Sequence, residues 1–121
     1  MTDTINSLFL EIKEKIKNDD PKNSYTAFLA NSGSENIAKK VVEEAFEVAT
    51  ASIEGPKHKN GKNQTILESA DLIYHLLVLL ASKDIEIGDV LAELEKRRQD
   101  KNLSANAILK NTKKLHEKQN N

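Results

Sequence analysis

Residues 64–83 form the most apolar stretch of the chain, and their pattern limits what the chain can fold into. Apolar side chains recur there at helical spacing in two stripes, Ile66, Ala70, Ile73, Leu77 and Leu80 in one and Leu72, Leu76 and Leu79 in the other. A single neighbouring helix cannot cover a helix that is apolar on two sides. We therefore expect this helix to lie at the centre of a helical bundle that is completed by dimerisation.

The rest of the chain shows the same helical period. Only 4 Gly and 2 Pro interrupt the 121 residues, and they lie where helices should end. Helices are predicted over residues 4–17, 35–54, 64–83 and 86–98. A short linking segment is expected at 24–28 and a weak helix at 104–116. The predicted fold class is all-α, a bundle of four to five helices over residues 1–99, followed by a Lys- and Asn-rich C-terminal tail over 100–121.

Charge and cysteine content exclude several classes of protein. The chain has 18 basic and 19 acidic side chains and a formal net charge of −1, so it lacks the positive surface that attracts nucleic acid or an anionic membrane. The absence of Cys excludes a disulfide scaffold and thiolate chemistry. The longest apolar run, residues 76–81, is too short to span a bilayer, and the amino terminus has no signal-peptide pattern. We expect a cytoplasmic protein with no nucleic-acid or membrane partner.

Acidic residues occur at helical spacing in two neighbouring helices. Glu43, Glu44 and Glu47 lie in the second predicted helix, and Glu68 and Asp71 lie in the third. Residues three apart are separated by about 60° around a helix axis, so Glu44 and Glu47 share one face, as do Glu68 and Asp71. If the two helices pack antiparallel, the two pairs face each other.

Converging carboxylates repel one another unless something neutralises them. Mg²⁺ prefers oxygen ligands and suits phosphate-bearing substrates. The pattern therefore predicts a Mg²⁺ site at which water attacks a polyphosphate. A solvated acidic face is the alternative, although Glu68 and Asp71 interrupt the most apolar helix, where an unpartnered charge is costly.

Other polar residues near the acidic motifs have more than one interpretation. His75 lies on the same stripe as Asp71, and it could contact a substrate phosphate, orient a carboxylate or be a hydrogen-bonded core residue. Lys57, Lys59 and Lys62 could close over phosphates or be solvated loop residues. The residue pattern alone does not decide between these roles.

The acidic pattern, Glu43-Glu44-x-x-Glu47 followed by Glu68-x-x-Asp71, resembles the signature of the all-α nucleoside triphosphate pyrophosphatases, the MazG-like superfamily. Three further segments resemble the phosphoribosyl-ATP pyrophosphatases of histidine biosynthesis within that superfamily. They begin at Ser24-Tyr25-Thr26, at Ala70 (through Tyr74-His75) and at Asp89.

The resemblance implies hydrolysis of the α–β phosphoanhydride of phosphoribosyl-ATP to phosphoribosyl-AMP and pyrophosphate, with Mg²⁺ as the cofactor and a homodimer as the assembly. The four residues that match metal-ligating positions are Glu44, Glu47, Glu68 and Asp71. Glu43 matches the remaining acidic position of the catalytic set. Lys40 matches a lysine of the family and, with His75, is a candidate for substrate binding.

Two other functions remain open. One is a house-cleaning pyrophosphatase of the same superfamily, which would act on free or damaged (deoxy)nucleoside triphosphates with the same metal chemistry. The other is a non-catalytic helical dimerisation module whose carboxylates are merely solvated.

Overall fold

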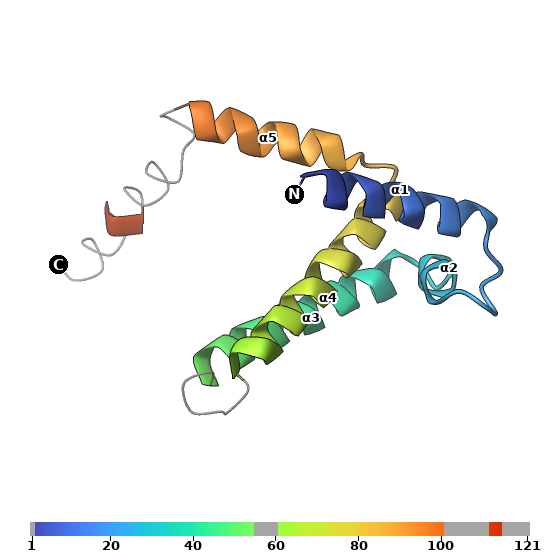
Figure 1. The fold of residues 1–121 in the computed structure, drawn as a ribbon, viewed down its shortest axis with the longest axis horizontal. Coiled ribbons are helices and arrows are strands. Elements are labelled where there is room, and N and C mark those ends of the chain that lie inside the picture. Colours follow the sequence, from blue (N-terminus) through green and yellow to red (C-terminus); the bar gives the residue numbers. More distant parts are fainter. Residues whose placement is uncertain (1, 55–60, 101–111, 115–121) are drawn as a thin grey trace. The chain divides into compact units, whose positions relative to one another are not determined.

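The computed structural model describes residues 2–54, 61–100 and 112–114, and no strand occurs in these ranges. The helices, drawn in Figure 1, are α1 (Thr2–Asn18), α2 (Tyr25–Asn31), α3 (Ser34–Glu54), α4 (Gly61–Ser82) and α5 (Ile87–Gln99). Two compact units divide the chain, one over residues 1–86 with α1 to α4 and one from residue 87 onward with α5. The all-α fold class is confirmed, and dimerisation stays a prediction.

The ends of the first helices follow local sequence signals. α1 ends at Asn18, shortly before Pro21, because the residue that precedes a proline avoids the helical conformation. Gly33 separates α2 from α3 with a φ of 103°, a conformation that glycine adopts without the steric cost other residues incur.

The expectation of a linking segment at 24–28 is wrong, because Tyr25–Asn31 forms the helix α2. Ser24 is its N-cap: the backbone is extended there, and the Ser24 hydroxyl accepts a hydrogen bond of 3.2 Å from the Ala27 amide. An N-cap serine satisfies an amide that has no partner within the first turn of the helix. This local signal makes a helix of seven residues possible where the hydrophobic period is too short to reveal one.

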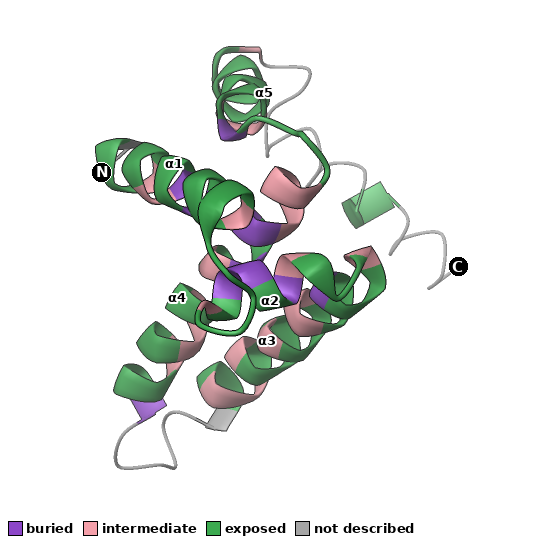
Figure 2. Ribbon diagram, turned by 90° about the vertical axis from the view of Figure 1, so that its right-hand side faces the viewer, coloured by how far each residue is buried: buried purple, intermediate pink, exposed green. Residues whose placement is uncertain are grey.

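In the first unit, α3 and α4 run side by side as an antiparallel pair (Figure 1). α1 contacts α2 and α4, and α2 also contacts α3. The buried apolar side chains of this unit are Phe9, Ile12, Ala27, Leu29, Ile37, Leu77 and Val78. They gather where α1 and α2 meet the α3–α4 pair (Figure 2). The core therefore lies at one end of the pair.

The other end of the α3–α4 pair keeps large apolar side chains exposed. They are Val42, Phe46 and Ile53 on α3 and Ile66, Leu67 and Ile73 on α4. Phe46 is 72% exposed and Ile53 is 76% exposed. Exposed apolar side chains of this size mark a candidate interaction surface. We call these six residues the apolar patch.

The rotation of α4 differs from the simplest expectation. Leu72 and Leu79, from the stripe expected to need a second chain, are half-buried; by helical spacing they share a side with Glu68, which faces α3. Ile66 and Ile73, from the stripe expected to pack inside one chain, are exposed. The stripe assignment was therefore wrong for these residues, because the side of α4 that carries the acidic residue packs against α3.

α4 is also long and apolar enough, by length and composition, to cross a membrane. This is weak evidence, since a central helix of a soluble bundle passes the same test. Glu68 and Asp71 lie within α4, and carboxylates at such positions are costly in lipid.

The second unit is described only in part. On α5, Arg98 lies 2.8 Å from Glu95 and Arg97 lies 3.3 Å from Glu93. Hydrogen bonds from Arg98 and then Gln99 lower the pKa of Glu95 to about 2. Most of the expected tail, with the weak helix predicted in it, lies outside the described residues. The same holds for Lys57 and Lys59 of the basic loop. Lys62 is described, and it is an exposed residue in the first turn of α4.

The core analysis yields a stability prediction. Ile37 is fully buried, so Ile37→Ala should lower the free energy of unfolding by about 2–5 kcal/mol through lost burial and the resulting cavity. The matched control is Ile85→Ala, since Ile85 is 43% exposed in the same unit. Urea unfolding followed by circular dichroism measures both variants, and equal losses would contradict the position of the core.

Candidate functional site

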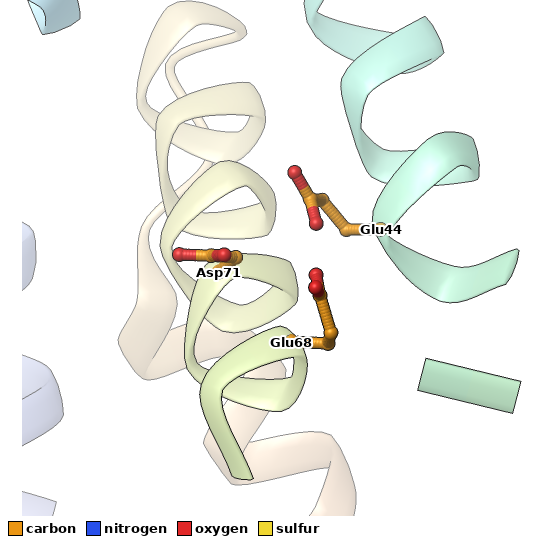
Figure 3. Close-up of side chains that lie close together, drawn as sticks. All are labelled: Glu44, Glu68 and Asp71. Carbon is orange, nitrogen blue, oxygen red and sulfur yellow. The ribbon is translucent and has the colours of Figure 1, made fainter. Parts of the chain in front are cut away.

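The packing of α3 against α4 brings acidic side chains from both helices together. One carboxylate oxygen from each of Glu44, Glu68 and Asp71 lies within 4.8 Å of those of the other two. Glu44 on α3 faces Glu68 across the gap between the helices, and Asp71 lies one turn further along α4 (Figure 3). These three residues belong to both of the motifs that the sequence singled out.

Glu47 joins this group through hydrogen bonds. Hydrogen bonding first to Glu68 and then to Glu44, with their charges nearby, raises the pKa of Glu47 to about 7. The pKa of Glu68 is lowered, chiefly by its hydrogen bond with Glu47, and Gln64 Nε2 donates to Glu68 Oε1 at 2.6 Å. Glu47 therefore keeps a proton to a higher pH than Glu68 does. We call Glu44, Glu47, Glu68 and Asp71 the acidic cluster.

The acidic cluster has the properties expected of a cation site. Burial, followed by the neighbouring carboxyl groups, raises the pKa of Glu44. Glu44 Oε2 is buried and has no hydrogen-bond partner in the described chain. A buried oxygen without a partner is costly, and a hard divalent cation would satisfy it while it neutralises the adjacent charges. The donor set, carboxylate oxygen throughout, suits Mg²⁺.

Glu43 and Lys40 lie beside the cluster rather than in it. Lys40 Nζ is 3.3 Å from Glu43 Oε2, and both side chains are largely exposed. The hydrogen bond and the charge of Glu43 raise the pKa of Lys40, so the ammonium group stays charged. The structure thus separates Glu43 from the four acids with which the sequence motif groups it.

His75 is buried next to the cluster. Its Nε2 lies 2.8 Å from the Tyr25 hydroxyl oxygen, and its Nδ1 lies 3.7 Å from Glu44 Oε1. Tyr74 contributes an edge-on ring contact to His75, and its hydroxyl is hydrogen-bonded to the Thr26 hydroxyl. Both ring nitrogens of His75 therefore face protein groups.

A hollow of about 480 Å³ opens beside the cluster. It is bounded by residues of α1, the segment that follows it, α2 and α4: Lys15, Asp19, Asn23, Ser24, Tyr25, Thr26, Asp71, Tyr74 and His75. Asp71 and His75 connect this hollow to the acidic cluster. If a cation at the carboxylates held the phosphates of a ligand, the rest of that ligand could lie in this hollow.

Several of these residues were not predicted as site residues. Tyr25, Thr26 and Tyr74 lie in segments that resemble the family, but the sequence pattern assigned them no role of their own. Gln64 was also missed, although its i,i+4 spacing to Glu68 is the pattern of a helical side-chain pair.

The raised pKa of Glu47 makes stability depend on pH. An acid whose folded-state pKa is raised stabilises the fold below its ordinary pKa, and this contribution is lost as the pH rises through the raised value, about 7 for Glu47. Between about pH 5 and about pH 8, the Tm of the metal-free protein should fall, and Glu47→Gln, which stays neutral, should reduce the fall.

Differential scanning calorimetry measures the effect, with Glu14→Gln on the exposed surface of α1 as the control. Mg²⁺ should raise the Tm more at the higher pH, because protons compete with the metal for carboxylates. A wild-type Tm that does not change over this range would contradict the raised pKa of Glu47.

Comparisons with known proteins show the family of the chain. The family model described as phosphoribosyl-ATP pyrophosphohydrolase matches residues 7–98. A phosphoribosyl-ATP pyrophosphatase of Pyrobaculum islandicum is 49% identical over 86 residues, which cover 71% of this chain and 85% of the relative. One from Metallosphaera sedula is 43% identical over 97 residues, 80% of this chain and 98% of the relative.

A longer relative matches over part of its length. The histidine biosynthesis bifunctional protein of Haemophilus influenzae is 44% identical over 88 residues, which cover 73% of this chain but only 37% of that protein. The family match includes α2 and all four residues of the acidic cluster. The chain belongs to the phosphoribosyl-ATP pyrophosphohydrolase family.

Proposed function

We propose that this protein hydrolyses phosphoribosyl-ATP at the α–β phosphoanhydride, which releases phosphoribosyl-AMP and pyrophosphate, as a cytoplasmic enzyme of histidine biosynthesis. The observation that carries the proposal is the acidic cluster, in which α3 and α4 place carboxylates within a few ångströms of one another. Membership of the family indicates which substrate the site would bind.

Glu44, Glu47, Glu68 and Asp71 are the residues that would hold Mg²⁺. When bound, Mg²⁺ neutralises phosphate oxygens and increases the acidity of water. The chain's own contribution is to keep four carboxylates on two packed helices, so that they need not be gathered when substrate arrives. The proton that the raised pKa of Glu47 retains near neutral pH would have to leave when a cation binds.

Substrate binding would use groups on either side of the cluster. The hollow lined by Tyr25, Tyr74 and Asn23 offers aromatic rings and hydrogen-bonding groups to a base or a ribose. Lys15 lies in the same hollow and could meet a phosphate. Lys40, charged and largely exposed, could meet another, and Glu43 would then position Lys40 rather than contact the metal.

We also propose that the active protein is a homodimer in which the apolar patch is covered by a second copy of the chain. Two antiparallel helices that bury one side against each other leave the opposite side of α4 in water, and two such pairs would form a four-helix bundle. The patch has members on both helices of the pair. All of them are aliphatic or aromatic, as is typical of obligate interfaces.

The activity is tested by assaying pyrophosphate release from phosphoribosyl-ATP with Mg²⁺, beside equal concentrations of ATP and dUTP. We expect turnover with phosphoribosyl-ATP and little with the other two. Preference for dUTP or ATP would favour a house-cleaning pyrophosphatase. No turnover with any of the three, and no Mg²⁺ binding at a defined stoichiometry, would favour a non-catalytic dimerisation module.

Variants of the acidic cluster test the metal site. Loss of a residue that only supports a metal ligand typically costs roughly 10–100-fold in activity. Glu47→Gln and Asp71→Asn remove proposed ligands, so each should reduce kcat/KM by more than that. Their helical circular dichroism should stay close to that of the wild type, since neither side chain is buried. Turnover within a few-fold of the wild type in both variants would contradict the site.

The assembly is tested by placing a charge in the apolar patch. Phe46→Asp would bury an unpaired carboxylate in the interface, at a cost of about 3–5 kcal/mol, and should shift the protein from dimer to monomer in light scattering. Leu10→Asp is the matched control, since Leu10 is a 63% exposed apolar residue on α1 outside the patch. A wild-type protein that is a stable, well-folded monomer at micromolar concentration would refute the dimer.

A further inference from the structure

His75 stands out among the polar side chains of the first unit because it is buried and held from several sides. It is 7% exposed. The Tyr25 ring, from α2, meets it edge-on with ring centroids 5.9 Å apart, and the Tyr74 ring, its neighbour on α4, does the same at 6.0 Å. Rotation of the imidazole is therefore restricted by α2 and by its own helix.

The two nitrogens of His75 have different partners, and this determines the tautomer. Nε2 lies 2.8 Å from the Tyr25 hydroxyl, which can donate or accept. Nδ1 faces Glu44 Oε1 at 3.7 Å, which is too long for a hydrogen bond, and it has no hydrogen-bond partner in the described residues. A lone pair on Nδ1 would repel the carboxylate, whereas an N–H would attract it. The proton therefore belongs on Nδ1, and the Tyr25 hydroxyl donates to Nε2.

The Tyr25 hydroxyl is suited to that role. Burial, more than any neighbouring charge, raises the pKa of Tyr25, so the phenol keeps its proton and remains a donor at neutral pH. Tyr25 is placed by α2, whose first turn is capped by Ser24 and whose Thr26 is hydrogen-bonded to Tyr74.

We infer that His75 is a positioning residue for Glu44: the imidazole, anchored by Tyr25, presents Nδ1 to Glu44 Oε1 at 3.7 Å and orients the carboxylate by electrostatic attraction, with its other oxygen free for a cation. The inference rests on the proposed function in that Glu44 is taken as a metal ligand. It assigns to His75 and Tyr25 a role in holding the site rather than in contacting substrate.

The consequence for Glu44 follows from its two oxygens. Oε1 faces His75, and Oε2 is buried without a hydrogen-bond partner in the described chain. A carboxylate held by one oxygen does not have to lose rotational freedom when the other binds a cation, so affinity rises. A glutamate on an exposed helix face would lack this preorganisation.

The tautomer is tested first, on the metal-free protein, by two-dimensional ¹H–¹⁵N correlation of the imidazole nitrogens. The signals of His75 are assigned by their loss in His75→Asn. We expect a proton on Nδ1 with Nε2 accepting from Tyr25, and in Tyr25→Phe we expect this arrangement to lose its predominance. A wild-type ring protonated on Nε2 would overturn the inference.

Two substitutions of His75 separate its two contacts. The Asn amide lies near the position of Nδ1, so His75→Asn keeps a donor toward Glu44 and loses the contact with Tyr25. The Gln amide reaches the position of Nε2, so His75→Gln keeps the contact with Tyr25 and loses the donor. Mg²⁺ affinity, measured by isothermal titration calorimetry without substrate, should fall roughly 10–100-fold in His75→Gln and less in His75→Asn.

Asn31→Ala is the control for general loosening of α2. It removes the hydrogen bond from Asn31 to the Ala27 carbonyl and none of the contacts of His75, so it should lower the Tm and leave the Kd for Mg²⁺ within about twofold of the wild type, far from the 10–100-fold effect of an outer metal partner.

The remaining outcomes all decide the question. An unchanged Kd for Mg²⁺ in His75→Gln, with a lower Tm, would make His75 a purely structural core residue and overturn the inference. An unchanged Kd for Mg²⁺ with a raised KM for phosphoribosyl-ATP would make His75 a substrate contact, and this too would overturn the inference. If the wild type binds Mg²⁺ and shows the Nδ1–H tautomer but does not hydrolyse phosphoribosyl-ATP, only the proposed substrate fails.

Discussion

The contact between α3 and α4 is the interaction on which the site depends. Each helix alone would present two carboxylates to water, where they would cost little and do nothing. Packed together, the helices force these groups to within a few ångströms, and the pKa of Glu47 rises to about 7 as a result. The same repulsion that destabilises the metal-free protein would favour the binding of a cation.

α1 and α2 support only one end of this pair, and that asymmetry has two consequences. Where they pack, the core is closed around residues such as Ile37 and Val78, and α2 brings Tyr25 to His75 beside Glu44. Where they do not reach, apolar side chains such as Phe46 stay in water. The first unit thus combines a well-packed support for the acidic cluster with a surface suited to a second copy of the chain.

Local spacing was enough to predict most of the helices and the composition of the acidic cluster. The 3.6-residue period identifies the helices, Pro21 and Gly33 limit them, and i,i+3 spacing places Glu44 with Glu47 and Glu68 with Asp71 on common faces. The resemblance to the pyrophosphatases depended on the same residues, and the family match confirms it. Helix α2 was missed because seven residues are too few to show a period, and only the capping serine indicated it.

The sequence by itself thus determined the all-α class, the family and which acids share a face, because these follow from residues a few positions apart. Only the tertiary structure decided the rest. The rotation of α4 leaves Ile66 and Ile73 exposed, Glu43 pairs with Lys40 outside the cluster, and both nitrogens of His75 face protein groups. Helical periodicity specifies which residues lie on one side of a helix, but which side meets a neighbour depends on contacts between residues far apart in the chain.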